Sequence, residues 1–259
     1  MHIDIRGAGP PLVLIHGWAM HGGVFAPLLA ELETQLQCWL VDLPGHGLSP
    51  AREGLALDAC AEQLARELPR ASVLGWSMGG AIALRLATLQ PERIERLIAI
   101  AASPCFVRQP DWPHGVEPRV FAEFGAALAQ DYRGTIERFL ALEVLGDEKA
   151  REELRFLRHE LDARPPPAAA VLEEGLRLLD ASDQRAALPH LACPSLWISG
   201  QRDRLVPWTA MQAAAALAGL GAAQPAGAGR WLNFPSAGHA PFLTRPREVA
   251  NAILEFVLG

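Results

Sequence analysis

The sequence of 259 residues has little of several features that would each indicate a particular class of protein. No run of eighteen or more apolar residues occurs, and the alanine-rich segment 210–218 is too short to cross a bilayer. Its four cysteines, Cys38, Cys60, Cys105 and Cys193, form no C-x-x-C pair and no dense pattern. We therefore expect buried thiols in a reducing compartment rather than a disulfide framework.

Positively charged residues are also fewer than negatively charged ones: 23 lysines and arginines stand against 29 aspartates and glutamates, for a formal net charge of -6. General nucleic-acid binding needs a basic surface, so we expect none. The first residues, "MHIDIRGAGPPLVLIHG", lack the cationic start and apolar core of a signal peptide. Together these features predict a cytoplasmic protein without membrane attachment, and we expect a monomer with no metal or cofactor.

Half of the residues are hydrophobic and 20% are charged, which is typical of a globular protein. Short continuous apolar runs alternate with helical patterns, as in a parallel sheet covered on both faces. This order predicts an α/β protein with repeated βαβ units and a doubly wound, mostly parallel sheet. We expect strands at 11–17, 38–45, 71–77, 96–103, 194–200 and 230–235, and helices at 24–35, 57–68, 78–89, 207–218 and 246–257.

The alternation stops between residues 106 and 185, where every pattern is helical: 117–130, 133–145, 147–162 and 168–179. An all-helical insertion between two parallel strands is best interpreted as a cap over the carboxyl edge of the sheet, where α/β proteins bind ligands. The predicted organisation is a core of residues 1–105 and 186–259 with a lid of residues 106–185. The alternative is an insertion with a purely structural role.

The stretch "VLGWSMGG" contains Ser77 in a G-x-S-x-G motif, after an apolar run and before a helical pattern. A nucleophile elbow has this context, since its strand-to-helix turn is so sharp that the residues around the serine must be small. The serine then stands at the positive N-terminus of the helix. A serine N-cap in a glycine-rich turn would fit the same local pattern.

A serine nucleophile needs a histidine base, which is oriented by a carboxylate. His239 lies in "SAGHAPF", between the last predicted strand and the final helix, and Asp203 follows the strand that ends at Gly200. The order Ser77, Asp203, His239 is the order of this triad in α/β-hydrolases. Asp203 could instead be a solvated turn residue, and Asp42 is a competing carboxylate, but Asp42 precedes the serine and more readily orders a turn.

Acyl transfer also requires hydrogen-bond donors for the developing oxyanion. The backbone N–H of Met78, directly after the nucleophile, is one candidate. The other is the N–H of Trp18, at the end of "LVLIHGW", whose ring could also form a wall of the acyl pocket. Trp18 as a simple core residue is the alternative.

With these residues assembled, the chain resembles the α/β-hydrolase superfamily over its full length. The motifs "LVLIHGW", "DLPGHGLS", "GWSMGG", "DRLVP" and "GHAPF" occur in the expected order. The resemblance implies serine-type ester hydrolysis. Dehalogenases and epoxide hydrolases of this fold need an aspartate where this chain has Ser77.

A narrower resemblance, carried by "LGWSMGG", "ASPCF" and "TIERFLALEVLG", is to the pimeloyl-[acyl-carrier protein] methyl ester esterases of biotin biosynthesis. It implies a serine carboxylesterase that releases methanol from a substrate held on an acyl-carrier protein. A broad short-chain carboxylesterase, and more remotely a non-catalytic binding protein, are the alternatives. The substrate contacts that the resemblance implies are Trp18, Ser77, Met78, Phe139, Leu140, Ala141, Leu142, Glu143 and His239.

In this group, arginines of the cap dock the acidic carrier, and the matching positions here are Arg138, Arg151 and Arg155. Arg151 and Arg155 are one helical turn apart, with Arg158 beside them, so the arginines could form a basic patch. A solvated helix face with balancing glutamates would look the same. The chain departs from the group at Gly134, where an arginine is expected.

Overall fold

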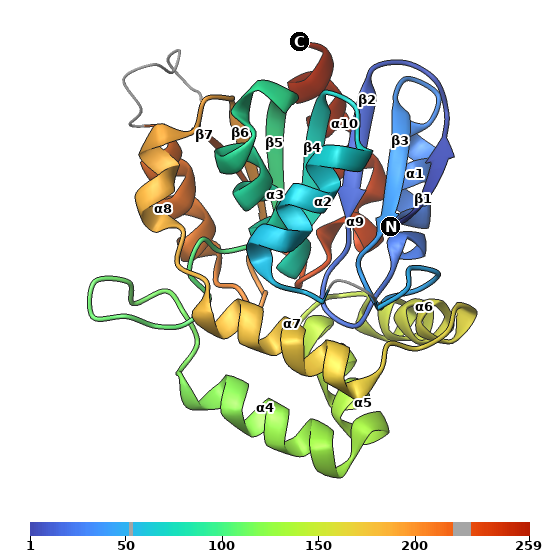
Figure 1. Cartoon of the computed structure of the whole chain (residues 1–259), viewed down its shortest axis with the longest axis vertical. Coiled ribbons are helices and arrows are strands. Elements are labelled where there is room, and N and C mark those ends of the chain that lie inside the picture. Colours follow the sequence, from blue (N-terminus) through green and yellow to red (C-terminus); the bar gives the residue numbers. More distant parts are fainter. Residues whose placement is uncertain (52–53, 220–228) are drawn as a thin grey trace.

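A single sheet forms the centre of the molecule (Figure 1). In the computed structural model, which describes residues 1–51, 54–219 and 229–259, seven strands lie in the order β1-β3-β2-β4-β5-β6-β7. β1 is antiparallel to β3, and all other neighbours are parallel. The strands are β1 His2–Arg6, β2 Pro11–Ile15, β3 Gln37–Asp42, β4 Ala71–Trp76, β5 Ile94–Ile100, β6 Ser195–Gly200 and β7 Gly229–Phe234.

The central strands are apolar on both faces because helices cover both sides of the sheet. Every residue of β4 is buried, and so are residues 12–15 of β2. β1 was not among the strands expected from the sequence. Its apolar and polar residues alternate and it is half-exposed, as is common for an antiparallel strand at the edge of a sheet.

Two of the covering helices, α2 and α3, lie on one face of the sheet, while α1 and α10 lie on the other (Figure 1). α3 is the most deeply buried of these, since nine of its twelve residues are buried. The helices outside the β5–β6 segment are α1 Ala26–Leu32, α2 Leu57–Glu67, α3 Met78–Leu89, α8 Trp208–Ala218, α9 Pro241–Thr244 and α10 Pro246–Leu258. Short 3₁₀ helices occupy Gly22–Phe25, Pro91–Arg93 and Arg185–His190.

Four further helices lie between β5 and β6 and pack beneath the carboxyl ends of the parallel strands (Figure 1). They are α4 Arg119–Gln130, α5 Tyr132–Glu143, α6 Ala150–Ala163 and α7 Ala169–Ala181. Each begins and ends within three residues of a helical pattern in the sequence. Residues 106–185, which include these four helices, are called the lid.

The lid is attached to the sheet through a buried ion pair. Asp42, at the end of β3, is fully buried, and its carboxylate accepts two hydrogen bonds from Arg164, at 2.6 and 2.7 Å. The same carboxylate accepts the backbone N–H groups of Gly22 and Leu48, both at 2.8 Å. Asp42 therefore orders the turn after β3 and ties it to the end of α6.

All four cysteines are buried thiols. Burial raises the pKa of Cys38 to about 12 and that of Cys193 to about 11. In the described ranges, no helix has both the length and the apolar character that a membrane span requires.

The ion pair predicts a clear difference between an arginine that pairs with a buried carboxylate and one that pairs with an exposed carboxylate. Replacing Arg164 by methionine removes the cationic partner of the buried Asp42 carboxylate, which keeps the N–H groups of Gly22 and Leu48. We therefore expect the free energy of unfolding to fall by about 3 kcal/mol. Arg85→Met breaks the exposed pair with Asp58 and should cost less than about 1 kcal/mol. Urea unfolding of the two variants measures both values, and equal small losses would contradict the role of Arg164.

Candidate active site

Ser77 lies at a sharp turn between β4 and α3, with φ 53° and ψ −119°. Few residues other than glycine adopt this backbone, which costs about 1–3 kcal/mol and requires support from the surrounding structure. A Cβ on Gly75 would lie 2.2 Å from the carbonyl oxygen of Gly79, and a Cβ on Gly79 would lie 2.2 Å from that of Ile15. The glycines are therefore needed for the close approach of strand and helix.

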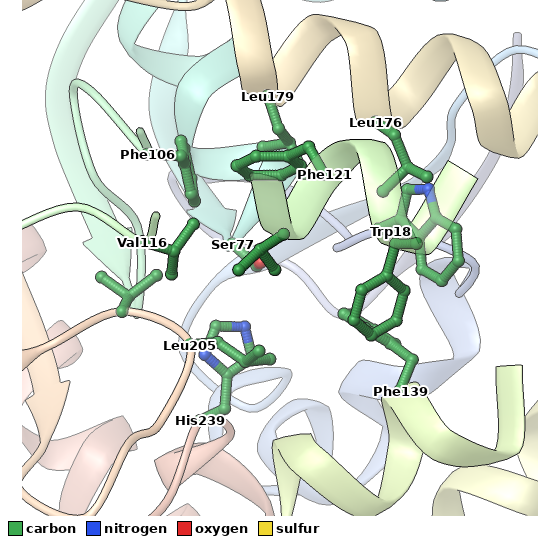
Figure 2. Close-up of a pocket in the computed structure, with 13 residues that line it drawn as sticks. Trp18, Ser77, Phe106, Val116, Phe121, Phe139, Leu176, Leu179, Leu205 and His239 are labelled. Atoms are coloured by element: carbon green, nitrogen blue, oxygen red, sulfur yellow. The ribbon is translucent and has the colours of Figure 1, made fainter. Parts of the chain in front are cut away.

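The alternative role of Ser77 as a helix cap does not match its hydrogen bonds. Its side chain makes no capping bond to α3, although its carbonyl accepts the N–H of Gly80 at 2.9 Å. The Ser77 N–H donates to the carbonyl of Ile100, also at 2.9 Å, and this bond anchors the turn to β5. The turn thus presents the hydroxyl to the cavity beneath the sheet (Figure 2).

Asp203 and His239 form a buried pair at the carboxyl ends of β6 and β7. The Nδ1–H of His239 donates to Oδ2 of Asp203 over 2.8 Å, and both side chains are fully buried. Oδ1 of Asp203 accepts the N–H groups of Leu205 and Val206, at 2.8 and 3.0 Å. These bonds hold the carboxylate in one orientation and direct the other ring nitrogen of His239, Nε2, away from it.

The loop that carries His239 is held from two sides. The His239 carbonyl accepts the indole N–H of Trp76 at 2.9 Å, and the His239 N–H donates to the carbonyl of Glu143 at 3.1 Å. In the described part of the chain, Nε2 of His239 has no hydrogen-bond partner. Figure 2 shows the imidazole and Ser77 facing the same cavity. No hydrogen bond joins the His239 imidazole to Ser77 within the described residues. Both residues line the cavity.

The two predicted oxyanion donors belong to residues close to Ser77. Met78 is the first residue of α3, and a Cβ on Gly17, which precedes Trp18, would lie 3.3 Å from the Cβ of Ser77. Within the described ranges, the backbone N–H groups of Trp18 and Met78 donate to no protein acceptor. Both are therefore available to a substrate oxygen.

The turn at Trp18 depends on His16, which the sequence analysis did not select. The Nδ1–H of His16 donates to the carbonyl of Gly17 at 2.7 Å, and its Nε2 accepts the N–H of Leu43 at 3.0 Å. Burial lowers the pKa of His16 to about 3, so the ring is neutral and can both donate and accept. The His16-Gly17 pair before Trp18 is the feature of the sequence from which this supporting role of His16 could have been predicted.

The cavity beneath Ser77 has an empty volume of about 550 Å³, including its open mouth. Trp18 and Phe139 form one side, with ring centroids 4.7 Å apart, and the Trp18 indole N–H donates to the carbonyl of Leu172 at 2.8 Å (Figure 2). The side chains that line it are almost all apolar: Trp18, Phe106, Val116, Val120, Phe121, Phe124, Phe139, Leu176, Leu179, Leu205 and Val206, together with Ser77 and His239.

Of this lining, the sequence predicted Trp18, Ser77, Phe139 and His239. Most of the missed residues lie in the lid, where their helical spacing could equally indicate packing. Of the predicted stretch 139–143, Phe139 lines the cavity and the other four residues do not. Leu140 is fully buried in the core, while Glu143 is buried behind the Asp203–His239 pair.

The predicted docking arginines lie on α5 and α6. Arg138 donates to Thr135 and Arg158 pairs with Glu137 at 2.6 Å, so these two are engaged locally. Arg151 and Arg155 are exposed, and neither makes an ion pair with another described residue. No group of three or more potential metal-ligating side chains occurs in the described ranges.

The sequence profile of the alpha/beta hydrolase family matches residues 12–252. The chain therefore belongs to the alpha/beta hydrolase family, and the predicted fold class is confirmed. Within this family it belongs with the pimeloyl-[acyl-carrier protein] methyl ester esterases, which confirms the narrower resemblance.

Curated relatives from several bacteria carry that name, and two of them serve as examples. One, from Stenotrophomonas maltophilia (strain R551-3), is 54% identical, covering 100% of this chain and 97% of the relative. The other, from Xanthomonas campestris pv. campestris (strain B100), is 53% identical, covering 99% and 98%. Among solved structures, an esterase from Exiguobacterium antarcticum superposes with a TM-score of 0.86 at 22% identity, covering 100% of this chain and 95% of that one. At this identity the structural likeness shows the fold alone.

The close packing at the turn predicts that Gly75 cannot carry a side chain. Gly75→Ala should lower the free energy of unfolding by about 3 kcal/mol, because the added Cβ overlaps backbone atoms. Ester turnover should also be lost. Gly125→Ala on α4 is the matched control, since a Cβ there meets nothing within 4 Å and alanine favours a helix by about 1 kcal/mol. Urea unfolding and a short-chain ester assay test both, and normal turnover in Gly75→Ala would refute the packing argument.

Proposed function

We propose that this protein is a cytoplasmic serine carboxylesterase that hydrolyses the methyl ester of pimeloyl-[acyl-carrier protein] in biotin biosynthesis. The observation that carries the proposal is the apolar cavity that ends on Ser77 and His239, with Asp203 bonded to His239 at 2.8 Å. The relatives above, which are named for this reaction, support the choice of substrate.

The proposed reaction begins when Nε2 of His239 takes the proton of Ser77 and the serine oxygen attacks the ester carbonyl. The N–H groups of Trp18 and Met78 stabilise the oxyanion, and such a donor is worth about 3–4 kcal/mol. His239 then gives its proton to the leaving methanol. Water, activated by the same histidine, hydrolyses the acyl-Ser77 and releases the free carboxylate. Asp203 keeps the imidazole in the required tautomer and stabilises its positive charge.

The lining of the cavity suits an uncharged ester better than the acid that it releases. No lysine or arginine is among the described residues that line it. Burying a carboxylate without a partner costs several kcal/mol, whereas a methyl ester loses little on leaving water. We infer that the cavity admits the methylated chain and expels the carboxylate product.

A carrier-bound substrate also needs a binding surface for its acyl chain and one for its carrier protein, and we propose that the lid provides both. It covers the carboxyl edge of the sheet, and it contributes Phe121, Phe124, Phe139, Leu176 and Leu179 to the cavity. Arg151 and Arg155, exposed on α6, are the proposed contacts for an acidic carrier protein, with Arg138 and Arg158 nearby. The lid residues would thus hold both the acyl chain and the carrier.

The nucleophile is tested with Ser77→Ala. We expect turnover of pimeloyl-carrier methyl ester to fall at least about 10⁴-fold, because the covalent route is lost. The variant should fail to complement a strain that cannot make the pimeloyl moiety, while wild type restores growth. Near-normal turnover by Ser77→Ala would exclude the serine mechanism. A wild type that cleaves simple short-chain esters but not the carrier ester would instead favour the broad carboxylesterase.

The carrier contact predicts a selective effect of charge reversal on α6. Arg151→Glu/Arg155→Glu should raise KM for the carrier ester by about tenfold, since like charges would oppose the acidic carrier. KM for a short-chain ester should not change. Arg6→Glu/Arg70→Glu, with the same charge change at the far end of the sheet, is the control. Equal effects of the two double variants would argue against docking at α6.

A further inference from the structure

A carboxyl group with no visible partner lies directly behind the proposed catalytic pair. Glu143 is the last residue of α5 and is only 1% exposed. Neither of its carboxyl oxygens has a hydrogen-bond partner among the described residues. Its side chain does not line the cavity, so a direct contact with the acyl chain does not explain its burial.

The charged groups around Glu143 are mostly of its own sign. Asp203 faces it from the loop after β6, and Glu153, which is 3% exposed and also without a partner, faces it from α6. Asp147, in the turn between α5 and α6, acts on Glu153 and accepts the Gly238 N–H at 2.8 Å.

The nearby cations are engaged with other groups. The Arg202 guanidinium donates to the carbonyl of Gly146, and Arg245 pairs with Glu148. Lys149 favours the ionised form of Glu153. None of these side chains is bonded to Glu143 in the described part of the chain.

Burial and the charges of Asp203 and Glu153 raise the pKa of Glu143 well above its ordinary value. Its place at the carboxyl end of α5 adds to this effect, because the negative end of the helix dipole disfavours an anion there. An ionised Glu143 would be a second buried negative charge beside Asp203. The neutral acid avoids that cost.

The backbone of the same residue is part of the catalytic loop's support. The carbonyl of Glu143 accepts the N–H of His239, and Phe139, one helical turn earlier on α5, lines the cavity. An outward movement of the end of α5 would therefore disturb both the histidine and the cavity wall.

We propose that Glu143 is a positioning residue, held as a neutral carboxylic acid, that keeps the end of α5 against His239 and leaves Asp203 as the charged partner of the imidazole. This assignment rests on the proposed ester hydrolysis by Ser77 and His239. Ionisation of Glu143 draws its side chain toward water, breaks the bond from His239 to the Glu143 carbonyl and inactivates the site. The enzyme thereby loses activity at alkaline pH.

The first experiment is the pH profile of kcat/KM from about pH 6 to about pH 10, with a short-chain ester as substrate. If the protonated form is the active one, wild-type activity falls by about tenfold per pH unit above the pKa of Glu143. Glu143→Gln keeps a neutral side chain of the same shape, so it should match wild type within about twofold near neutrality and lose the alkaline decline. A short-chain ester keeps the result independent of the carrier proposal.

Glu153→Gln is the matched control, since it removes a neighbouring buried acid whose carboxyl oxygens have no hydrogen-bond partner among the described residues. Burial raises the pKa of Glu153 from its ordinary value of 4.5 to about 8, so the stability of wild type falls as pH rises from about 4.5 to about 8 and levels off above that. Glu153→Gln should lessen this loss of stability, measured by thermal unfolding, while the alkaline decline in kcat/KM remains. A decline lost equally in both variants would assign the effect to general unfolding and overturn the proposal.

Infrared spectroscopy tests protonation without any substrate. The C=O stretch of a buried protonated carboxylic acid should be present in wild type at neutral pH, and Glu143→Gln should remove one such band that Glu153→Gln retains. Coincident pH profiles of wild type and Glu143→Gln, or identical carboxylic-acid bands in the two, would refute the proposal. A Ser77→Ala protein that still hydrolyses the ester would instead refute the proposed function and leave the infrared result standing.

Discussion

The left-handed backbone at Ser77 is the constraint on which the rest of the site depends. It allows β4 to turn into α3 within a single residue, and the contact is so close that Gly75 and Gly79 have no space for a Cβ. The turn projects the serine out of the sheet and places the Met78 N–H next to it. A strained conformation of this kind persists only where packing overdetermines it. Here the buried β2, β4 and α3 provide that packing.

The lid forms most of the cavity wall opposite the residues that the sheet positions, Ser77 and His239. A helical segment between β5 and β6 closes the cavity with aromatic and aliphatic side chains. The same segment supports the loop that carries His239, since the carbonyl at the end of α5 accepts the His239 N–H. Through Arg164 it is also tied to Asp42, at the end of β3. The lid therefore lines the cavity and supports the position of His239 through one set of packed helices.

Much of the architecture could be predicted from sequence because its signals are local. Continuous apolar runs identify buried parallel strands, and "VLGWSMGG" identifies a turn that requires small residues. The edge strand β1 was missed, since five alternating residues are a weak signal. The roles of Ser77, Asp203 and His239 stay predictions of function. The pairing of Asp203 and His239 at 2.8 Å is a fact of the structure.

The sequence by itself determined the fold class, the family and the chain order of serine, aspartate and histidine, because each depends on residue types at short range. Only the tertiary structure decided which lid side chains face the cavity, since a helical apolar stripe looks the same whether it packs on protein or on substrate. It also separated Phe139, which lines the cavity, from Glu143, which lies behind Asp203. One helical turn divides these two residues, and the direction in which α5 packs gives them different surroundings.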